Sequence, residues 1–457
     1  MTDLIERVKC SVIITLSDNT EIDISLSALG EATNLTNYIT EIDIDESTNT
    51  QNSNPVGVVS SNTLKLTLNS MDRSLFPENT KSSYYGLMNN TATIKVALED
   101  VDGTVKFNTF YVNNWKSDIT SQRPNKVIIE CTDLLSIINK NNVPSGVITQ
   151  KLSTKEAFIY MIDKLNAKLE EKYKVQYDEA NIAFDVFDSI EYDNLDTGSM
   201  SDWLNTLSQC TLTNIYMARD DKLRTDYCLD DTAKESVCNL SDKVNITSAS
   251  VDTGGLVNYT GVKTNYIVNT INNMNKMTTL SNQAVKPGMN LFDNISLGSK
   301  VFRINAVRLI SNESSALKLT KLEYDKRVCS IQVENSTQMN IDCTIEVYGQ
   351  SLKENTLSVT KNKNSSNEIL SVTNKLILPD YAELYTDNLL SLVGIRNSSI
   401  SVTGFFNPRI KLGDTVYVDV EKSINTSGYY KVIELQWKIS NTLKCTAKLI
   451  KTIVKEA

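Results

Sequence analysis

The sequence predicts a mainly β protein with an α+β insert, built from two similar β-barrel domains and smaller helix-containing domains. Three observations predict this class. β-Branched residues recur in short alternating runs that Ser, Thr and Asn turns separate, as in antiparallel strands. Proline is scarce, at 7 of 457 residues. Helical periodicity is confined to a few segments, and two distant segments repeat one series of elements.

The length accommodates three or four domains of roughly 100–200 residues each. Composition changes along the chain favour four. They are the first β-barrel domain at 1–145, the helix-containing α+β insert at 146–240, a β-rich domain at 241–350, and a helix plus the second β-barrel domain at 351–457.

The first domain is predicted from strands with clean alternation. Residues 64–68 place three leucines on one face of a strand. The polar stretch 46–62 predicts a long surface loop, and Val101-Asp102-Gly103 supplies a hairpin turn. Further strands are expected at 8–16, 21–26, 39–44, 94–98, 107–115 and 126–131, with an irregular crossing over 69–79.

The insert changes to helical periodicity. Ser153 and Glu156 form a capping box, in which each side chain satisfies a backbone donor of the other residue. The apolar residues that follow lie on one helical face: Phe158, Met161, Ile162, Leu165 and Leu169. A second helix follows Ser199 and directs Trp203 inward, where core packing is favoured over a ligand-stacking role. A hairpin around 219–222 follows.

The last two domains are again strand-rich. Pro287-Gly288 predicts a turn between strands. The polar stretch 355–368 predicts a loop or linker, and 378–393 predicts a third helix with one buried stripe. Strands resume after Asn397 and continue to the end.

Two segments, 94–132 and 416–446, share one series of features. Each has a strand, a turn, an aromatic strand, a Trp-Lys pair, a turn and a strand ending in Cys-Thr. Trp115 matches Trp437, and Cys131 matches Cys445. Coincidence is the alternative, because all meander hairpins are rich in such residues, but the shared order favours duplication. Three chains around an axis would then present six equivalent barrels.

Charge and histidine content exclude several functions. The net charge is −9 with no basic block, so specific nucleic-acid binding is not expected. An acidic surface could line a conduit for DNA, although ordinary solubilising charge explains the same balance. Histidine is absent, which excludes catalytic triads, Cys-His dyads and His-ligated metals within the chain. We therefore expect that the protein is not an enzyme. We also expect no catalytic, cofactor-binding or metal-ligating residues.

The eight cysteines are scattered without a CxxC pair, so buried free thiols are expected instead of disulfides or zinc. They are Cys10, Cys131, Cys210, Cys228, Cys238, Cys329, Cys343 and Cys445. No signal peptide and no run of eighteen apolar residues is visible, so we expect folding in a reducing cytoplasm and no membrane-spanning segment.

Two stretches resemble phage tail hub proteins, which include the baseplate hub of contractile tails and the N-terminal hub part of siphophage tail-associated proteins. Residues 64–79, followed by Tyr85-Gly86-Leu87, are similar to that family's leucine strand, Asn/Asp crossing and Tyr-Gly. Residues 406–416 resemble the Asn-Pro … Leu-Gly-Asp-x-Val entry to its last barrel. The helix 378–393 and the helix and hairpin around Trp203 are also similar to this family. The resemblance thus covers most of the chain in order, except 240–350.

The resemblance implies a structural homotrimer at the virion tail tip, assembled in the host cytoplasm, with tail-tube-like barrels. Such a hub adapts a six-fold tube to a three-fold tip and lets DNA or tube contents pass. Implied partners are the tail tube or distal tail ring above, a spike, needle or fibre below, and possibly the tape measure protein. Some relatives add a C-terminal peptidoglycan hydrolase, but here the chain stops at Ala457, so none is expected.

Two other functions stay open. A carbohydrate-binding tail adhesin, or other receptor-binding structural protein, would use exposed aromatic platforms, for which 19 tyrosines but only 3 tryptophans are present. A peptidoglycan-cleaving enzyme would use paired carboxylates, and no pair rises above chance.

Overall fold

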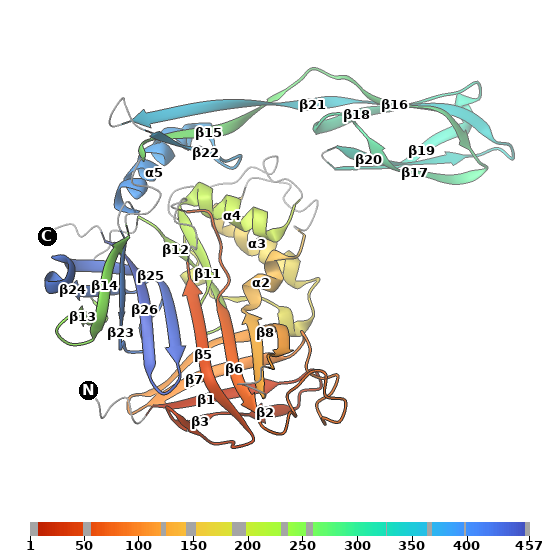
Figure 1. Ribbon diagram of the computed structural model, residues 1–457. Helices are drawn as coiled ribbons and strands as arrows, with labels where there is room; N and C mark the ends of the chain where they lie inside the picture. The colour runs from red at the N-terminus through yellow and green to blue at the C-terminus, as the bar shows by residue number, and fades with distance from the viewer. Residues whose placement is uncertain are drawn as a thin grey trace. The chain divides into compact units, whose positions relative to one another are not determined.

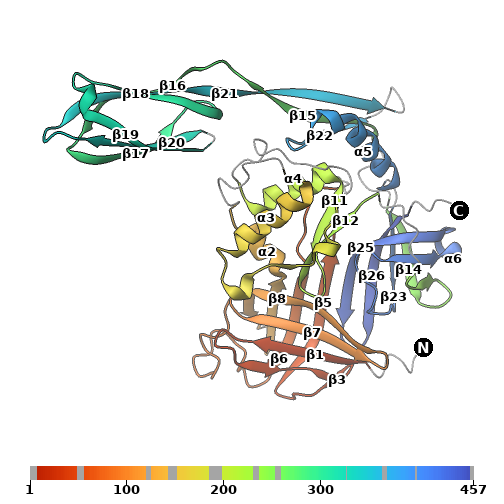
Figure 2. The same ribbon diagram turned by 180° about the vertical axis from the view of Figure 1, so that it is seen from behind.

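The computed structural model (Figures 1 and 2) shows two compact units. The first comprises Met1–Thr264, Val359–Leu376 and Tyr381–Ala457, and the second comprises Asn265–Ser358 and Ile377–Asp380. The predicted four-domain division stays a prediction. The structure describes residues 8–48, 56–119, 125–142, 152–184, 198–229, 236–252, 259–325, 327–362, 368–396 and 399–452.

The first unit contains two curled, half-barrel sheet modules of six strands each. In the first module the strands lie in the spatial order β5-β6-β9-β8-β7-β1. Their bounds are β1 Lys9–Thr15, β5 Asn37–Ser47, β6 Thr63–Ser70, β7 Thr93–Asp100, β8 Gly103–Ser117 and β9 Lys126–Thr132. The short strands β2 (Glu21–Asp23), β3 (Leu26–Ala28) and β4 (Glu31–Ala32) extend the sheet beyond β1.

The second module has the order β14-β23-β26-β25-β24-β13. Its strands are β13 Asn239–Ser241, β14 Ile246–Asp252, β23 Ser399–Gly404, β24 Thr415–Asp419, β25 Ser427–Ile439 and β26 Leu443–Lys451. If the six strands of each module are numbered in chain order, both modules have the same spatial order, 2-3-6-5-4-1. One difference is that β1 runs antiparallel to β7, whereas β13 runs parallel to β24.

The two modules also agree in register. In the first, β5 has a bulge beside Thr40, whose hydroxyl donates to the Thr67 carbonyl at 3.1 Å. In the second, β14 has a bulge beside Thr247, whose hydroxyl donates to the Thr403 carbonyl at 3.0 Å. Two sheets that share strand order and bulge positions represent one repeated design, because bulges fix local register. The predicted pair of similar sheets is confirmed.

A second bulge corrects the residue alignment within the repeat. It lies at position 113 of β8 and at position 433 of β25, each opposite the last strand of its module. Aligning these bulges places Leu435, not Trp437, at the position of Trp115. The predicted match of the two tryptophans is thus wrong by two residues. Backbone hydrogen bonds set the register, and they do not require identical side chains.

The cysteine match fails for a related reason. Cys445 pairs with Trp437, and its counterpart in the first module is Val127, which pairs with Ser117. The segment between the two strands is longer in the first module, 118–125, than in the second, 440–442. Spacing read across this turn therefore shifts the apparent alignment.

A helical layer comes between the modules in the chain. The capping box at Ser153 and Glu156 is present, and α3 buries its predicted apolar face, although Leu169 lies beyond its end. Trp203 is buried and stacks on Phe158 at 6.2 Å between ring centroids, which confirms core packing. The elements are α2 Leu134–Asn139, α3 Thr154–Asn166, η1 Glu171–Tyr173, β10 Gln176–Tyr177, η2 Glu179–Asn181, α4 Met200–Thr211, β11 Thr213–Met217 and β12 Lys222–Tyr227.

The second unit has its own apolar core, made mostly of Ile, Val and Leu side chains. A three-stranded sheet has the order β17-β20-β19, and β16 and β18 pair with β21. The predicted turn at Pro287-Gly288 is present, with Gly288 at φ +85°. Its elements are β16 Asn275–Val285, β17 Gly288–Ser296, β18 Val301–Ile310, η4 Ser314–Ala316, β19 Leu317–Asp325 and β20 Val328–Asn335. β15 (Tyr259–Ile271) and β21 (Ile341–Asn362) have residues in both units, and β22 (Glu368–Thr373) belongs to the first.

Two predicted loops are partly wrong. Strand β5 continues to Ser47, and Glu46, Thr48 and Asn62 are buried, so the ends of 46–62 belong to the core, while 49–55 lie outside the described residues. Strand β21 likewise runs through 355–362, and 363–367 lie outside them. Polar composition misled in both places because the strands continue across polar residues.

Of the two remaining helices, one was predicted and the short α6 was not. The predicted helix 378–393 is observed as η5 (Pro379–Tyr381) followed by α5 (Ala382–Arg396), with its predicted stripe buried. A short α6 (Glu421–Ile424) follows β24. All eight cysteines have free thiols, as predicted; seven are buried, whereas Cys238 is only half-buried. No helix in the described part of the chain is long and apolar enough to cross a membrane.

Candidate functional site

The feature that unites the first unit is a seam where the two modules meet. Strand β5 of the first module pairs antiparallel with β25 of the second, from Ile42 opposite Ile439 to Ser47 opposite Glu434. Because β25 also pairs with β24 and β26, this single strand carries the seam. The modules thereby form one continuous 15-stranded sheet.

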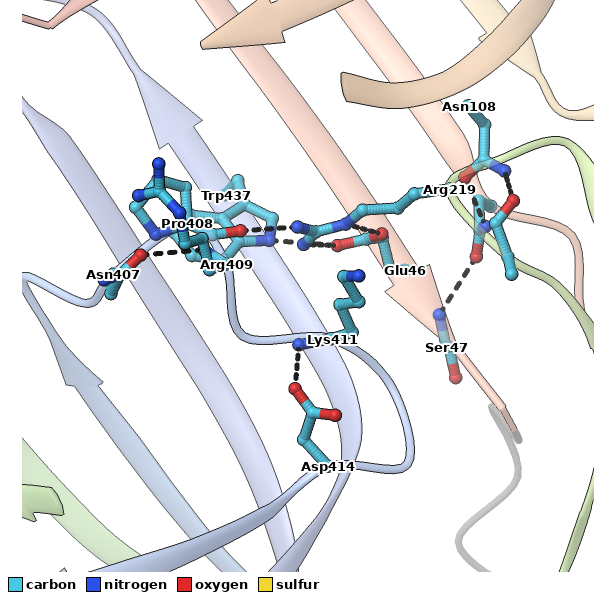
Figure 3. Close-up of polar contacts among 12 residues, drawn as sticks. Glu46, Ser47, Asn108, Arg219, Asn407, Pro408, Arg409, Lys411, Asp414 and Trp437 are labelled. Atoms are coloured by element: carbon cyan, nitrogen blue, oxygen red, sulfur yellow. Dashed lines mark hydrogen bonds and ion pairs between the residues drawn. The ribbon is translucent and has the colours of Figure 1, made fainter. Parts of the chain in front are cut away.

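A buried ion pair lies at this seam (Figure 3). The Arg219 guanidinium donates from Nε to Oε1 of Glu46 at 2.7 Å and from Nη2 to Oε2 at 2.5 Å. The side chains are only 7% and 2% exposed, respectively. The indole Nε1 of Trp437 donates a third hydrogen bond to Oε2 at 3.0 Å. The carboxylate therefore receives donors from the helical layer and from the second module at once.

The guanidinium is also enclosed by aromatic rings and a carbonyl. Its Cζ lies 4.6 Å from the Phe107 ring centroid and 5.6 Å from that of Trp437. Nη1 donates to the carbonyl of Pro408. Bidentate pairing and ring stacking are the contacts for which arginine is suited. Burying both charges costs desolvation energy, which these bonds offset, and the net role of such a pair is to specify one arrangement.

A second contact joins the 405–414 segment to the first module. Arg409 donates to both carboxylate oxygens of Asp100, at 2.6 and 2.8 Å, beside the predicted hairpin turn. The Arg409 guanidinium lowers the pKa of Asp100 from its ordinary value. Gly413, in the same segment, has φ +83°, a left-handed conformation that favours glycine. Asp414 accepts from the amide of Lys411 at 2.8 Å, which closes the turn before β24.

Asn62 organises a polar network on the other side of the seam. Its Nδ2 donates to Oδ1 of Asn108 at 2.8 Å and to the Met217 carbonyl at 3.0 Å. Its backbone amide donates to Asp133 at 2.9 Å. Asp133 is fully buried and also caps α2 through Leu135 N. Burial raises the pKa of Asp133 to about 7.

A cavity of about 390 Å³ lies between β12 and residues 411–415. Three of its four charged side chains, those of Arg224, Asp226 and Asp414, already have partners within the chain. Arg224 donates to Asp220 at 2.7 Å, and Asp226 accepts from Lys431 at 2.7 Å. Charges satisfied in this way offer little to a ligand, so the cavity is a poor candidate for a binding site.

No site residues are predicted from the sequence, yet the structure shows a buried ion pair at the seam. Glu46 was placed in a surface loop and Arg219 in a hairpin turn, so nothing local pointed to their pairing. Among the residues that the structure describes, no group of three or more Cys, Asp or Glu side chains could hold a metal ion. The seam is suited to holding two sheets in one geometry.

Comparisons with known proteins address the fold. No protein-family model matches the chain, and no curated protein matches its sequence. Two solved structures resemble it over nearly their whole length. The tail protein from Neisseria meningitidis MC58 has a TM-score of 0.52 at 9% identity, over 97% of this chain and 96% of that one. The 43 kDa tail protein of prophage MuSo2 from Shewanella oneidensis has a TM-score of 0.52 at 9% identity, over 96% and 98%. The chain thus has the fold of these two tail proteins, in agreement with the resemblance in its sequence.

Proposed function

We propose that this chain is a structural hub subunit of a phage tail or a related injection particle. Three copies would form a ring that adapts a six-fold tube to a three-fold tip and lets DNA or tube contents pass. The shared fold with two tail proteins, one of them from a prophage, supports a role in a tail. The proposed location is the virion tail tip, with assembly in the host cytoplasm.

The observation that carries the proposal is the repeated module. Both modules have one strand order, and both have bulges beside Thr40 and Thr247 with equivalent hydroxyl–carbonyl bonds. Three copies around an axis therefore supply six nearly equivalent modules, and closed cyclic symmetry turns these into a ring. Such an adaptor needs matching strand edges and no catalytic residues, which fits a chain without histidine.

The neighbours that this role requires are a tail tube or distal tail ring on one face and a spike, needle or fibre on the other. The tape measure protein is a further candidate inside the ring. The acidic net charge of −9 suits a conduit that repels DNA instead of binding it. An adhesin with tryptophan platforms is not proposed, since Trp115, Trp203 and Trp437 are all buried.

The mass of the purified protein in solution tests the ring. Light scattering during size-exclusion chromatography should give three times the 51.0 kDa of one chain. Electron microscopy of whole particles, with the chain labelled, should place it at the tail tip as a six-lobed ring. A protein that stays monomeric or dimeric at all concentrations, and that labels no part of a tail, would refute the proposal.

A further inference from the structure

Two strand edges of the first unit lack a partner among the described strands. β14 ends the strand order of the main sheet and pairs only with β23. β8 pairs with β7 through its first half, up to Tyr111, and with β9 through its second half. The Val112 amide still donates to the Ala92 carbonyl at 3.0 Å, and the Ser117 hydroxyl donates to Glu78, but beyond Val112 no described strand pairs with the edge of β8 that faces away from β9. Unpaired edges are templates for another strand.

The repeat assigns a counterpart to each open edge. β14 corresponds to β5, because both carry the threonine bulge. The second half of β8 corresponds to the second half of β25, because both follow the second bulge. Within the chain, β5 and β25 pair with each other at the seam. The two open edges are thus the counterparts of the two edges that are already joined.

The known register of the seam transfers directly to the open edges. At the seam, Ile42 is opposite Ile439, Asp43 is opposite Lys438, and Ile44 is opposite Trp437. The corresponding pairs are Ala249 with Ile119, Ser250 with Asp118, and Val251 with Ser117.

Exposure of apolar residues agrees with this transfer. Ile119 is 53% exposed, whereas its counterpart Ile439 is fully buried. Val251 is 47% exposed, whereas its counterpart Ile44 is fully buried. Large β-branched residues on two open strand edges are expected where a partner strand covers them. At the β5–β25 seam, where the partner strand belongs to the same chain, the two counterpart residues are covered.

One chain cannot make this second seam by itself. Six strands separate β14 from β8 in the sheet, and Figures 1 and 2 both show β14 (green) and β8 (orange) at opposite sides of the unit. A second copy offers the missing edge, with β14 of one copy meeting β8 of the next. Such a head-to-tail contact repeats until a ring closes.

We propose that copies of this chain join by antiparallel pairing of β14 with the second half of β8, in the register of the β5–β25 seam. This inference rests on the proposed hub function, which sets the number of copies in the ring at three. It specifies the joining edges, the direction of the strands and the residues that meet.

The register identifies a pair suited to a disulfide. The amide of Asp118 donates to the Lys126 carbonyl at 2.9 Å, so it faces β9 and not the open edge. Asp118 and Ser250 would then form a non-hydrogen-bonded pair across the new seam, with Cα atoms about 4.5 Å apart. This distance lies within the range that disulfides span.

Cysteine cross-linking tests the pairing. Asp118→Cys and Ser250→Cys chains, made separately with different tags and co-expressed, should form a mixed disulfide after mild oxidation. Each variant alone should form none, because the contact is head-to-tail. A chain carrying both changes should give a covalent ladder that ends at the closed ring. Ser248→Cys, two residues along β14, should replace Ser250→Cys with far lower yield, and the unmodified chain controls for its own thiols.

The outcomes separate the two proposals. Ring-sized assemblies without a 118–250 disulfide, or disulfides within a single variant, would overturn the strand pairing. A specific 118–250 disulfide in assemblies that are not trimers would support the pairing and refute the three-fold hub.

An association measurement gives a second test. Val251→Asp should weaken self-association at least about tenfold, because it places a charge in the new seam. Its thermal midpoint as a separate chain should not change, since Val251 is exposed there. Val244→Asp, at another exposed valine outside the edge, should leave association unchanged. Equal effects of the two substitutions would count against the proposed seam.

Discussion

The indole Nε1 of Trp437 donates at 3.0 Å to Oε2 of Glu46, across the seam between the two sheet modules. The same carboxylate receives two hydrogen bonds from Arg219, in the helical layer. One buried group thus links three parts of the chain. Because an unpaired buried charge is costly, displacement of any of the three parts would be opposed.

Removing the cation should therefore destabilise the first unit strongly. Arg219→Met leaves Glu46 buried with a single donor, and we expect a loss of about 3–5 kcal/mol in unfolding free energy. Urea unfolding monitored by fluorescence measures it. Arg224→Met, in the same hairpin, is the matched control. Its exposed pair with Asp220 should contribute less than about 1 kcal/mol. Equal losses in the two variants would contradict this account of the seam.

The two strand tryptophans should differ in their response to phenylalanine. Trp437→Phe removes a bond to a carboxylate, which is worth about 1.5–3 kcal/mol. Trp115→Phe removes a 3.0 Å bond to the Leu75 carbonyl, a neutral acceptor worth about 0.5–1.5 kcal/mol. The lost ring volume is the same in both, so the difference in unfolding free energy reports the acceptor charge. A larger loss of unfolding free energy for Trp115→Phe than for Trp437→Phe would argue against this role of the acceptor charge.

Asp133 should make stability depend on pH. Its pKa is raised from 3.8 to about 7 by burial, so between these values the folded chain holds a proton that the unfolded chain releases. The unfolding free energy should consequently fall as pH rises from about 4 to about 7, by up to about 4 kcal/mol from this group.

Asp133→Asn isolates that contribution, because an amide does not titrate there and its oxygen can still accept from Leu135 N. Unfolding curves at several pH values should show a shallower fall for the variant than for the unmodified chain. Parallel pH profiles would show that Asp133 is ionised in the folded state.

Two glycines should respond to alanine with opposite signs. Gly413 has φ +83°, so Gly413→Ala should cost about 1–2 kcal/mol from backbone strain, although its Cβ would meet nothing closer than 3.6 Å. Gly394 lies in α5, where an added Cβ would have no neighbouring atom within 4 Å, so Gly394→Ala should stabilise by up to about 1 kcal/mol. Thermal midpoints that move in the same direction would disagree with these conformations.

Local signals in the sequence were reliable where local energies decide. The Ser153 capping box, the Ser199 cap and the turn before Gly288 all lie where the sequence predicts them. Each depends on hydrogen bonds or φ angles within a few residues. The duplication was also detectable, because equivalent strands keep similar apolar patterns.

Residue matching within the repeat and the seam residues could not be read in this way. Trp115 and Trp437 look equivalent by spacing, but the bulges at 113 and 433 set a register in which they differ by two residues. Glu46 lies in a polar run that resembles a surface loop. Its partner Arg219 is 173 residues away, and no local feature distinguishes a carboxylate that will be buried.

The sequence by itself determined the strand-rich class, the positions of the three longest helices, the repetition of a sheet module and the absence of histidine chemistry. Tertiary structure alone decided which strand edges meet, which charges are buried together and which edges stay open for another copy. The physical reason is range. Propensity, capping and turn geometry act between neighbours, whereas strand register and desolvation depend on segments that only the folded chain brings together.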